Sequence, residues 1–151
     1  MATAESTYVD PSALLKLYLH QRESAAMNAW RARTKGPLPV THHGRVEVTN
    51  GICLAAHRRD ITRDALTDTL ASLDEDFASG HYRQADLLWR ATLNRAADLS
   101  RTYSPQLGTR SLDVLHVASA LELELRHFVT YDRRQRDLAR SVGLKVLAPA
   151  A

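Results

Sequence analysis

The sequence predicts an α/β fold in which a central parallel sheet is covered by helices on both faces. Short apolar segments of strand type alternate along the chain with longer segments of helical spacing. Gly, Pro and Ser punctuate these segments, and the chain shows no internal repeat, low-complexity tract or domain linker. Short strands separated by helices favour parallel pairing, and parallel sheets are normally buried on both faces.

The first half of the chain predicts two strands and three helices. Asp10 is expected to cap the first helix and Pro11 to occupy its first position, because both residue types suit those places. A helix that follows is expected to stop near Gly36. In order, the predicted elements are a strand at 6–9, helices at 11–19 and 25–33, a strand at 38–41 and a helix over 46–55.

The second half begins with two segments of helical spacing, 61–77 and 84–103, on either side of a break at Ser79 and Gly80. They predict a helical hairpin inserted into the fold. The remaining predicted elements are a loop at 104–109, a helix at 112–125, a strand at 127–131, a helix at 133–142 stopped by Gly143, and a strand at 144–147.

Length and composition favour one folded unit. With 151 residues, 44% of them hydrophobic, the chain can bury a core, and we expect a single domain over residues 1–151. No signal peptide or membrane-length apolar stretch is visible, so a membrane is not an expected partner. The lone Cys53 cannot form an internal disulfide, which favours the reducing cytoplasm, and its apolar neighbours predict that it fills the core.

Four acidic residues each lie beside an apolar segment that has no other use for a charge: Asp10, Glu47, Asp113 and Asp132. Two carboxylates about 4 Å apart repel by about 4 kcal/mol at an effective dielectric near 20, so a cluster requires cations or bound protons. Mg²⁺ prefers oxygen ligands of this kind and keeps waters and substrate phosphate beside them. The acids therefore favour a metal-dependent nuclease.

The chain resembles the PIN-domain ribonucleases, and specifically the VapC-like toxins of bacterial toxin–antitoxin pairs. The segments that carry the resemblance are 8–17, 45–50, 110–121 and 128–134, in this order and spacing. The resemblance implies a three-layer α/β/α fold and cleavage of RNA that depends on Mg²⁺ or Mn²⁺. It also implies a small antitoxin as partner and a homodimer.

Carried over position by position, the family's acidic metal ligands fall on Asp10, Glu47, Asp113 and Asp132. The small hydroxyl residue that precedes the last acid is Thr130. By this resemblance, the four acids are the expected catalytic residues and Thr130 supports them.

Each acid also has a purely structural interpretation. Asp10 suits a helix cap, and Glu47 would be favoured by the helix dipole in a first turn. Asp113 would be tolerated in the first turn of a helix capped by Ser111, although its apolar neighbours make a buried, partnered carboxylate the stronger interpretation.

Arginines concentrate near two of the acids in the C-terminal third. Arg110, Arg133 and Arg134 are candidates for binding substrate phosphate, since a guanidinium grips phosphate oxygens. A solvated helix face explains them equally well. Asp137 could replace Asp132 in the site or pair with an arginine of its own helix.

Two other functions are compatible with parts of the sequence. Arg110 and His116 match the Arg-x-x-x-x-x-His pattern of the all-helical HEPN ribonucleases, which act without metal. Otherwise, we expect His116 to serve in structural hydrogen bonding. The second rival is a catalytically inactive PIN-like module that only binds RNA or protein.

Overall fold

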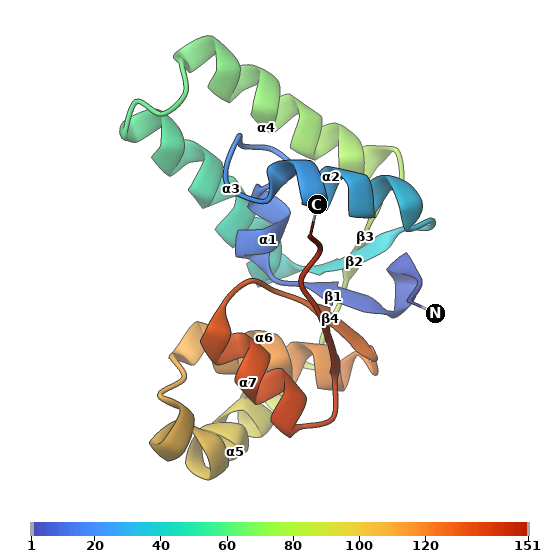
Figure 1. Ribbon diagram of the computed structural model, residues 1–151, viewed down its shortest axis with the longest axis vertical. Coiled ribbons are helices and arrows are strands. Elements are labelled where there is room, and N and C mark those ends of the chain that lie inside the picture. Colours follow the sequence, from blue (N-terminus) through green and yellow to red (C-terminus); the bar gives the residue numbers. More distant parts are fainter. Residues whose placement is uncertain (1, 151) are drawn as a thin grey trace.

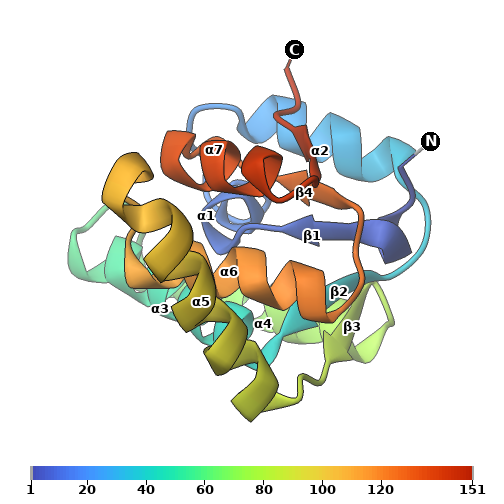
Figure 2. The ribbon, with the colours of Figure 1, turned by 90° about the horizontal axis from the view of Figure 1, so that it is seen from below.

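All strands of the computed structural model, which describes residues 2–150, run parallel to their neighbours. β1 (Thr7–Val9), β4 (His127–Val129) and β5 (Lys145–Leu147) form one sheet in the order β1-β4-β5. β2 (Leu38–Thr41) and β3 (Tyr82–Ala85) form a second pair. Because β2 packs beside β1, the two sheets form one continuous layer through the molecule (Figure 2).

Helices cover this layer on both sides (Figure 1, Figure 2). Val9 and Val129 pack with side chains from the first four helices, whereas Tyr8 and Phe128 pack with the last three. This division follows from the alternation of side chains along a strand, and it confirms the predicted three-layer α/β/α fold. The helices are α1 (Pro11–Leu15), α2 (Ser24–Arg33), α3 (His42–His57), α4 (Arg63–Ala78), α5 (Trp89–Leu107), α6 (Ser111–Glu122) and α7 (Arg133–Ser141).

The helical hairpin of the structure consists of α3 and α4, and the predicted pairing of 61–77 with 84–103 is wrong. In Figure 1, α3 and α4 lie side by side, while α5 lies at the opposite end of the molecule, where it packs on α6. The start of the second predicted helix is instead β3, in register with β2 from Leu38 opposite Tyr82. Ala85, at the other end of β3, is also buried.

The loop predicted at 104–109 is shorter than expected, because α5 continues through Pro105 to Leu107. Pro105 falls in the last turn of α5, where it removes one i→i−4 hydrogen bond just before the helix ends. The helix stops at Gly108, whose positive φ of 66° is the left-handed conformation that glycine adopts at low cost.

Cys53 is exposed, so the prediction that it fills the core is wrong. The buried face of α3 includes Val48, Ile52 and Ala55. Cys53 follows Ile52 directly, and a step of one residue rotates a side chain by about 100° around a helix. The apolar run around the cysteine therefore contains positions on both faces of α3.

The sheet register places two predicted site residues together at one edge. Val9 pairs with Val129, so Asp10 and Thr130 follow directly at the carboxyl ends of β1 and β4. The backbone N–H of Asp10 donates to the carbonyl of Val129 at 3.0 Å.

Among the described residues, none of the helices combines the length and apolar character that crossing a membrane requires.

Candidate active site

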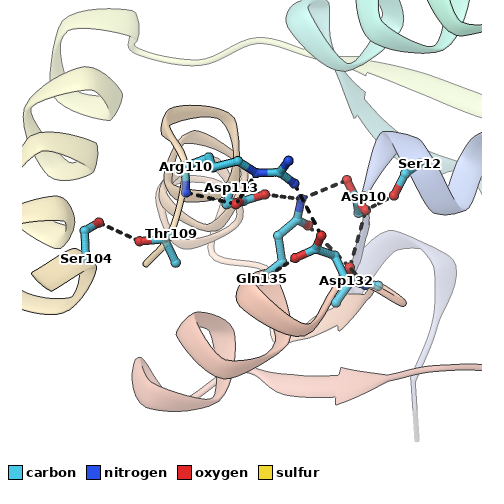
Figure 3. A network of polar contacts seen from close by, with 9 residues as sticks. Asp10, Ser12, Ser104, Thr109, Arg110, Asp113, Asp132 and Gln135 are labelled. Atoms are coloured by element: carbon cyan, nitrogen blue, oxygen red, sulfur yellow. Dashed lines mark hydrogen bonds and ion pairs between the residues drawn. The ribbon is translucent and has the colours of Figure 1, made fainter. Parts of the chain in front are cut away.

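A cleft of about 570 Å³ opens at the carboxyl ends of β1 and β4, where the first turns of α6 and α7 face α3. It gathers all of the predicted acids, although they come from different parts of the chain. Figure 3 shows three of the four acids pointing toward one another. The polar residues that line the cleft are Asp10, Ser12, Glu47, Arg110, Ser111, Asp113, His116, Asp132 and Gln135.

The side-chain amide of Gln135 joins the two most deeply buried acids. Its Nε2 donates to Oδ1 of Asp10 at 3.2 Å and to Oδ1 of Asp113 at 3.1 Å (Figure 3). Asp10 and Asp113 are only 3% and 2% exposed. Two carboxylates from distant elements therefore converge on a single nitrogen, where each is stabilised by a hydrogen bond.

Hydroxyl groups hold the other oxygen of Asp10. Ser12 and Thr130 donate to Oδ2, the latter at 3.3 Å. Burial raises the pKa of the Asp10 carboxyl above its ordinary value, and the hydrogen bonds from Ser12 and Gln135 oppose that shift only in part. Asp10 is the N-terminal cap residue of α1 and Pro11 follows at the first position, as predicted, but within residues 2–150 the Asp10 side chain makes no capping bond, so capping does not account for its carboxylate.

Asp113 and Asp132 each use one carboxylate oxygen to accept a hydrogen bond from a backbone N–H at the start of a helix. Oδ2 of Asp113 accepts from the backbone N–H of Arg110 at 3.0 Å, and Oδ1 of Asp132 accepts from that of Gln135 at 3.0 Å. The N-terminal residue that caps α6 is Arg110, whereas the sequence suggested Ser111. Oδ2 of Asp113 thus has the structural role of accepting a hydrogen bond at the helix start. Oδ1 instead accepts a hydrogen bond from Gln135 in the cleft.

The guanidinium of Arg110 lies between two of the acids. Its Nε is 3.4 Å from Asp113 and its Nη2 is 3.5 Å from Asp132, and its side chain remains 66% exposed. It can therefore balance carboxylate charge and still meet a ligand from solvent. Arg133 and Arg134 are exposed on α7 and do not line the cleft.

Asp137 pairs with arginines of its own helix, as one of the two interpretations predicted. Its carboxylate lies 3.9 Å from Nε of Arg133 and 3.3 Å from Nε of Arg136. It does not line the cleft. Asp137 therefore serves below as a matched control for the acids that do.

Glu47 lies in the second turn of α3, because the helix begins at His42 with Thr41 as its cap, earlier than the sequence suggested. Its Oε2 is 2.5 Å from Nε2 of His116, whose other ring nitrogen meets Tyr8. The expected structural role of His116 in hydrogen bonding is thus confirmed. The all-helical HEPN alternative is wrong, because the chain forms a parallel sheet.

Gln135 and Ser12 are site residues that the sequence interpretation missed. In the segment 133–141, Gln135 stands among arginines and resembles a residue of a solvated helix face. A usable signal was nonetheless present, since Gln135 precedes Leu138 and Ala139 at the i, i+3, i+4 spacing of one helix face. All three are buried in α7.

The donor set fits a hard divalent cation, although no three His, Cys, Asp or Glu side chains of residues 2–150 converge at ligand distance. The amide of Gln135 donates hydrogen bonds to Asp10 and Asp113, and the guanidinium of Arg110 lies near Asp113 and Asp132, where it balances carboxylate charge. Mg²⁺ commonly takes only one or two protein carboxylates and completes its octahedron with water and phosphate. Asp10 and Asp113, which already meet on one nitrogen, suit this mode.

No protein-family model matches the chain. Among curated proteins, it is 32% identical over 145 residues to Ribonuclease VapC46 of Mycobacterium tuberculosis (strain ATCC 25618 / H37Rv), with 95% of this chain and 97% of the relative covered. It is 28% identical over 156 residues to Ribonuclease VapC47 of Mycobacterium tuberculosis (strain CDC 1551 / Oshkosh), with the same coverage. These full-length similarities, together with the α/β/α fold, show that the chain belongs to the VapC-like PIN-domain ribonucleases.

Proposed function

We propose that the protein is a metal-dependent endoribonuclease that hydrolyses single-stranded or structured RNA and acts as the toxin of a toxin–antitoxin pair. Family membership supports ribonuclease activity, since both relatives carry that name. The observation that carries the metal dependence is the convergence of two buried carboxylates, Asp10 and Asp113, on one nitrogen in a cleft that also contains Glu47 and Asp132.

Asp10 and Asp113 would hold the cation, with Glu47 and Asp132 as further ligands at the same cleft. When bound, Mg²⁺ or Mn²⁺ lowers the pKa of a coordinated water and stabilises negative charge on the phosphate. Thr130 and Ser12 keep Asp10 in place through its Oδ2.

The reaction is hydrolysis of a phosphodiester. The water oxygen forms a bond to phosphorus, the bond from phosphorus to the 3′ oxygen breaks, and a water proton ends on that 3′ oxygen. The products carry a 5′-phosphate and a 3′-hydroxyl, and the ribose 2′-hydroxyl is not consumed. Glu47 and Asp132, each 26% exposed at the side chain, are the acids that a water in the cleft reaches most readily.

Purified protein is expected to cleave single-stranded RNA with Mg²⁺ or Mn²⁺ and to lose this activity in excess EDTA. The physical reason is that clustered carboxylates repel the phosphate backbone unless a cation lies between them. Sequencing both ends of the fragments checks the predicted 5′-phosphate and 3′-hydroxyl. Undiminished cleavage in EDTA, or fragments with 2′,3′-cyclic phosphate ends, would rule out the proposed reaction.

The affinity of the protein for Mg²⁺ distinguishes a metal-dependent enzyme from an inactive binding module. A module that only binds RNA or protein has no use for a cation, so its apparent Mg²⁺ affinity would be as weak as that of the Asp10→Ala variant. The proposed function predicts that the unaltered protein binds Mg²⁺ measurably more tightly than this variant. Isothermal titration calorimetry makes the comparison without any RNA.

RNA binding is expected to weaken with salt, and Arg110→Ala is expected to reduce that dependence. In a catalytically inactive Asp10→Asn background, loss of one phosphate contact should lower the slope of log K against log salt by about 1. Arg133→Ala and Arg134→Ala test the remaining candidates in the same titration. Arg58→Ala, exposed at the end of α3, is the control; a slope equal to the control's assigns a given arginine a surface or structural role.

A restraining partner is part of the proposal, because an active ribonuclease threatens the RNA of its own cell. The proposed antitoxin covers the cleft, and a basic side chain from it would satisfy the same carboxylates that bind the metal. Co-expression with the neighbouring small gene is expected to yield a complex with little ribonuclease activity. A lone protein that is fully active yet harmless on induction would contradict a toxin role.

A homodimer in the cytoplasm completes the proposed assembly. Light scattering of the purified protein is expected to give twice the 16.8 kDa chain mass. A mass of one chain at all concentrations tested would remove the homodimer from the proposal and leave the ribonuclease activity unaffected.

A further inference from the structure

Three side chains from three separate elements form a continuous hydrogen-bonded line that ends at the cleft. Tyr8 of β1 places its hydroxyl 2.5 Å from Nδ1 of His116 on α6. Nε2 of the same ring lies 2.5 Å from Oε2 of Glu47 on α3. Tyr8 and His116 are 3% and 1% exposed, so solvent does not compete for these contacts.

Packing fixes the two inner members of this line. The Tyr8 ring stacks on Phe128 with centroids 5.3 Å apart and an interplanar angle of 4°. The His116 ring stacks on His43 with centroids 5.1 Å apart and an angle of 25°. Each ring is buried and packs against an aromatic neighbour, which restricts its rotation, so each nitrogen of His116 keeps its partner.

The number of protons available determines which group donates in each of the two hydrogen bonds. A tyrosine hydroxyl donates one proton, a neutral imidazole has one donor and one acceptor nitrogen, and a carboxylate only accepts. With a neutral ring, each contact receives one proton only when Tyr8 donates to Nδ1 and Nε2–H donates to Glu47. The opposite tautomer would place a lone pair of Nε2 against a carboxylate oxygen.

Glu47 depends on this line for its orientation. In the described part of the chain, His116 is its one hydrogen-bond partner, whereas Asp10, Asp113 and Asp132 each have several. A glutamate has more rotatable bonds than an aspartate and loses more side-chain entropy when it is held. Glu47 is therefore the acid whose position is most sensitive to a single neighbour.

We propose that Tyr8 and His116 are positioning residues for Glu47: Tyr8 fixes His116 as the Nε2–H tautomer, and His116 holds Oε2 so that Oε1 is left for the cation. This inference rests on the proposed function, because it assigns Glu47 to a metal site. Partners that orient metal ligands in this way typically contribute 10–100-fold in metal affinity or activity.

Tyr8→Phe tests the proposal with little disturbance, because the ring that stacks on Phe128 is kept and only the hydroxyl is lost. Tyr82→Phe is the matched control: Tyr82 is also a buried strand tyrosine, 5% exposed, and its hydroxyl meets that of Tyr18 at 2.7 Å, outside the cleft lining. Melting temperatures of both variants establish that each is folded before any other comparison.

The expected result is that Tyr8→Phe weakens Mn²⁺ affinity, measured by calorimetry, and RNA cleavage by about tenfold or more. Tyr82→Phe should leave both within about twofold. In a Glu47→Gln background, Tyr8→Phe should have little further effect, because Tyr8 is proposed to act only through the carboxylate that Glu47→Gln has already removed. Full additivity of the two changes would overturn the proposal.

The ¹⁵N spectrum of histidine-labelled protein tests the tautomer independently of activity. We expect the neutral Nε2–H form of His116 in the unaltered protein and a loss of that preference in Tyr8→Phe. An imidazolium or Nδ1–H form in the unaltered protein overturns the inference even if the protein cleaves RNA with Mg²⁺. Absence of both Mn²⁺ binding and cleavage in the unaltered protein would instead overturn the proposed function, and the inference with it.

Discussion

Asp113→Asn is expected to lower RNA cleavage by at least about a hundredfold while the protein stays folded, because a metal ligand should cost more than the orienting neighbours of a ligand. The change is nearly isosteric. Asn can still accept the backbone N–H of Arg110 at the start of α6, so a purely structural Asp113 would tolerate it with a stability change of about 1 kcal/mol or less.

Asp137→Asn is the matched control for this variant, because Asp137 lies outside the cleft lining and pairs with arginines of α7. It should retain cleavage at close to the unaltered rate. Cleavage and thermal melting, measured with and without Mg²⁺, complete the comparison. Near-normal turnover in Asp113→Asn would remove Asp113 from the metal site.

Asp10→Asn is expected to abolish cleavage and, in the absence of divalent metal, to stabilise the fold at neutral pH. Burial raises the pKa of Asp10, so the folded protein holds this proton to a higher pH than the unfolded chain does. The free energy of unfolding therefore falls as pH rises from the ordinary aspartate pKa, about 3.9, through the raised one. Removing the charge eliminates this loss, and relief of repulsion adds to the gain, on the order of 1 kcal/mol in total.

Thermal melts between pH 4 and 8 in EDTA check this sign. The stability of the unaltered protein should decline as the pH rises. In Asp10→Asn this decline should be smaller, because the contribution of Asp10 is absent. Added Mg²⁺ should then stabilise the unaltered protein and leave Asp10→Asn unchanged, because only a native state that binds the ion gains free energy from it. A less stable Asp10→Asn in EDTA at pH 7 would show that the hydrogen bonds from Ser12, Thr130 and Gln135 outweigh the cost of burying the charge.

The sequence predicted the placement of the candidate acids where the local pattern and the final position coincide. Asp10 and Asp132 follow apolar strand-like segments, and the carboxyl ends of parallel strands meet at one edge of a sheet. Asp113 interrupts an apolar helix, which marks a buried charge. For Asp10 and Asp113, burial and placement follow from segments of a few residues, and so does the placement of Asp132, so a single sequence is enough to predict them.

The parts that the sequence did not reveal depend on contacts between distant segments. β3 is four residues long, and its identity as a strand is decided by pairing with β2, more than 40 residues earlier. Gln135 becomes a site residue only because α7 places it between Asp10 and Asp113. The contact of Glu47 with His116 likewise requires α3 to approach α6, which neither helix's periodicity encodes.

The most direct test of the account measures bound Mn²⁺ by electron paramagnetic resonance and RNA cleavage in the same sample over a range of Mn²⁺ concentrations. If the gathered acids hold the catalytic cation, occupancy and cleavage should rise together in the unaltered protein and in Asp137→Asn. Both should be lost in Asp113→Asn. Cleavage that proceeds with no bound Mn²⁺, or full Mn²⁺ occupancy in Asp113→Asn, would contradict the account.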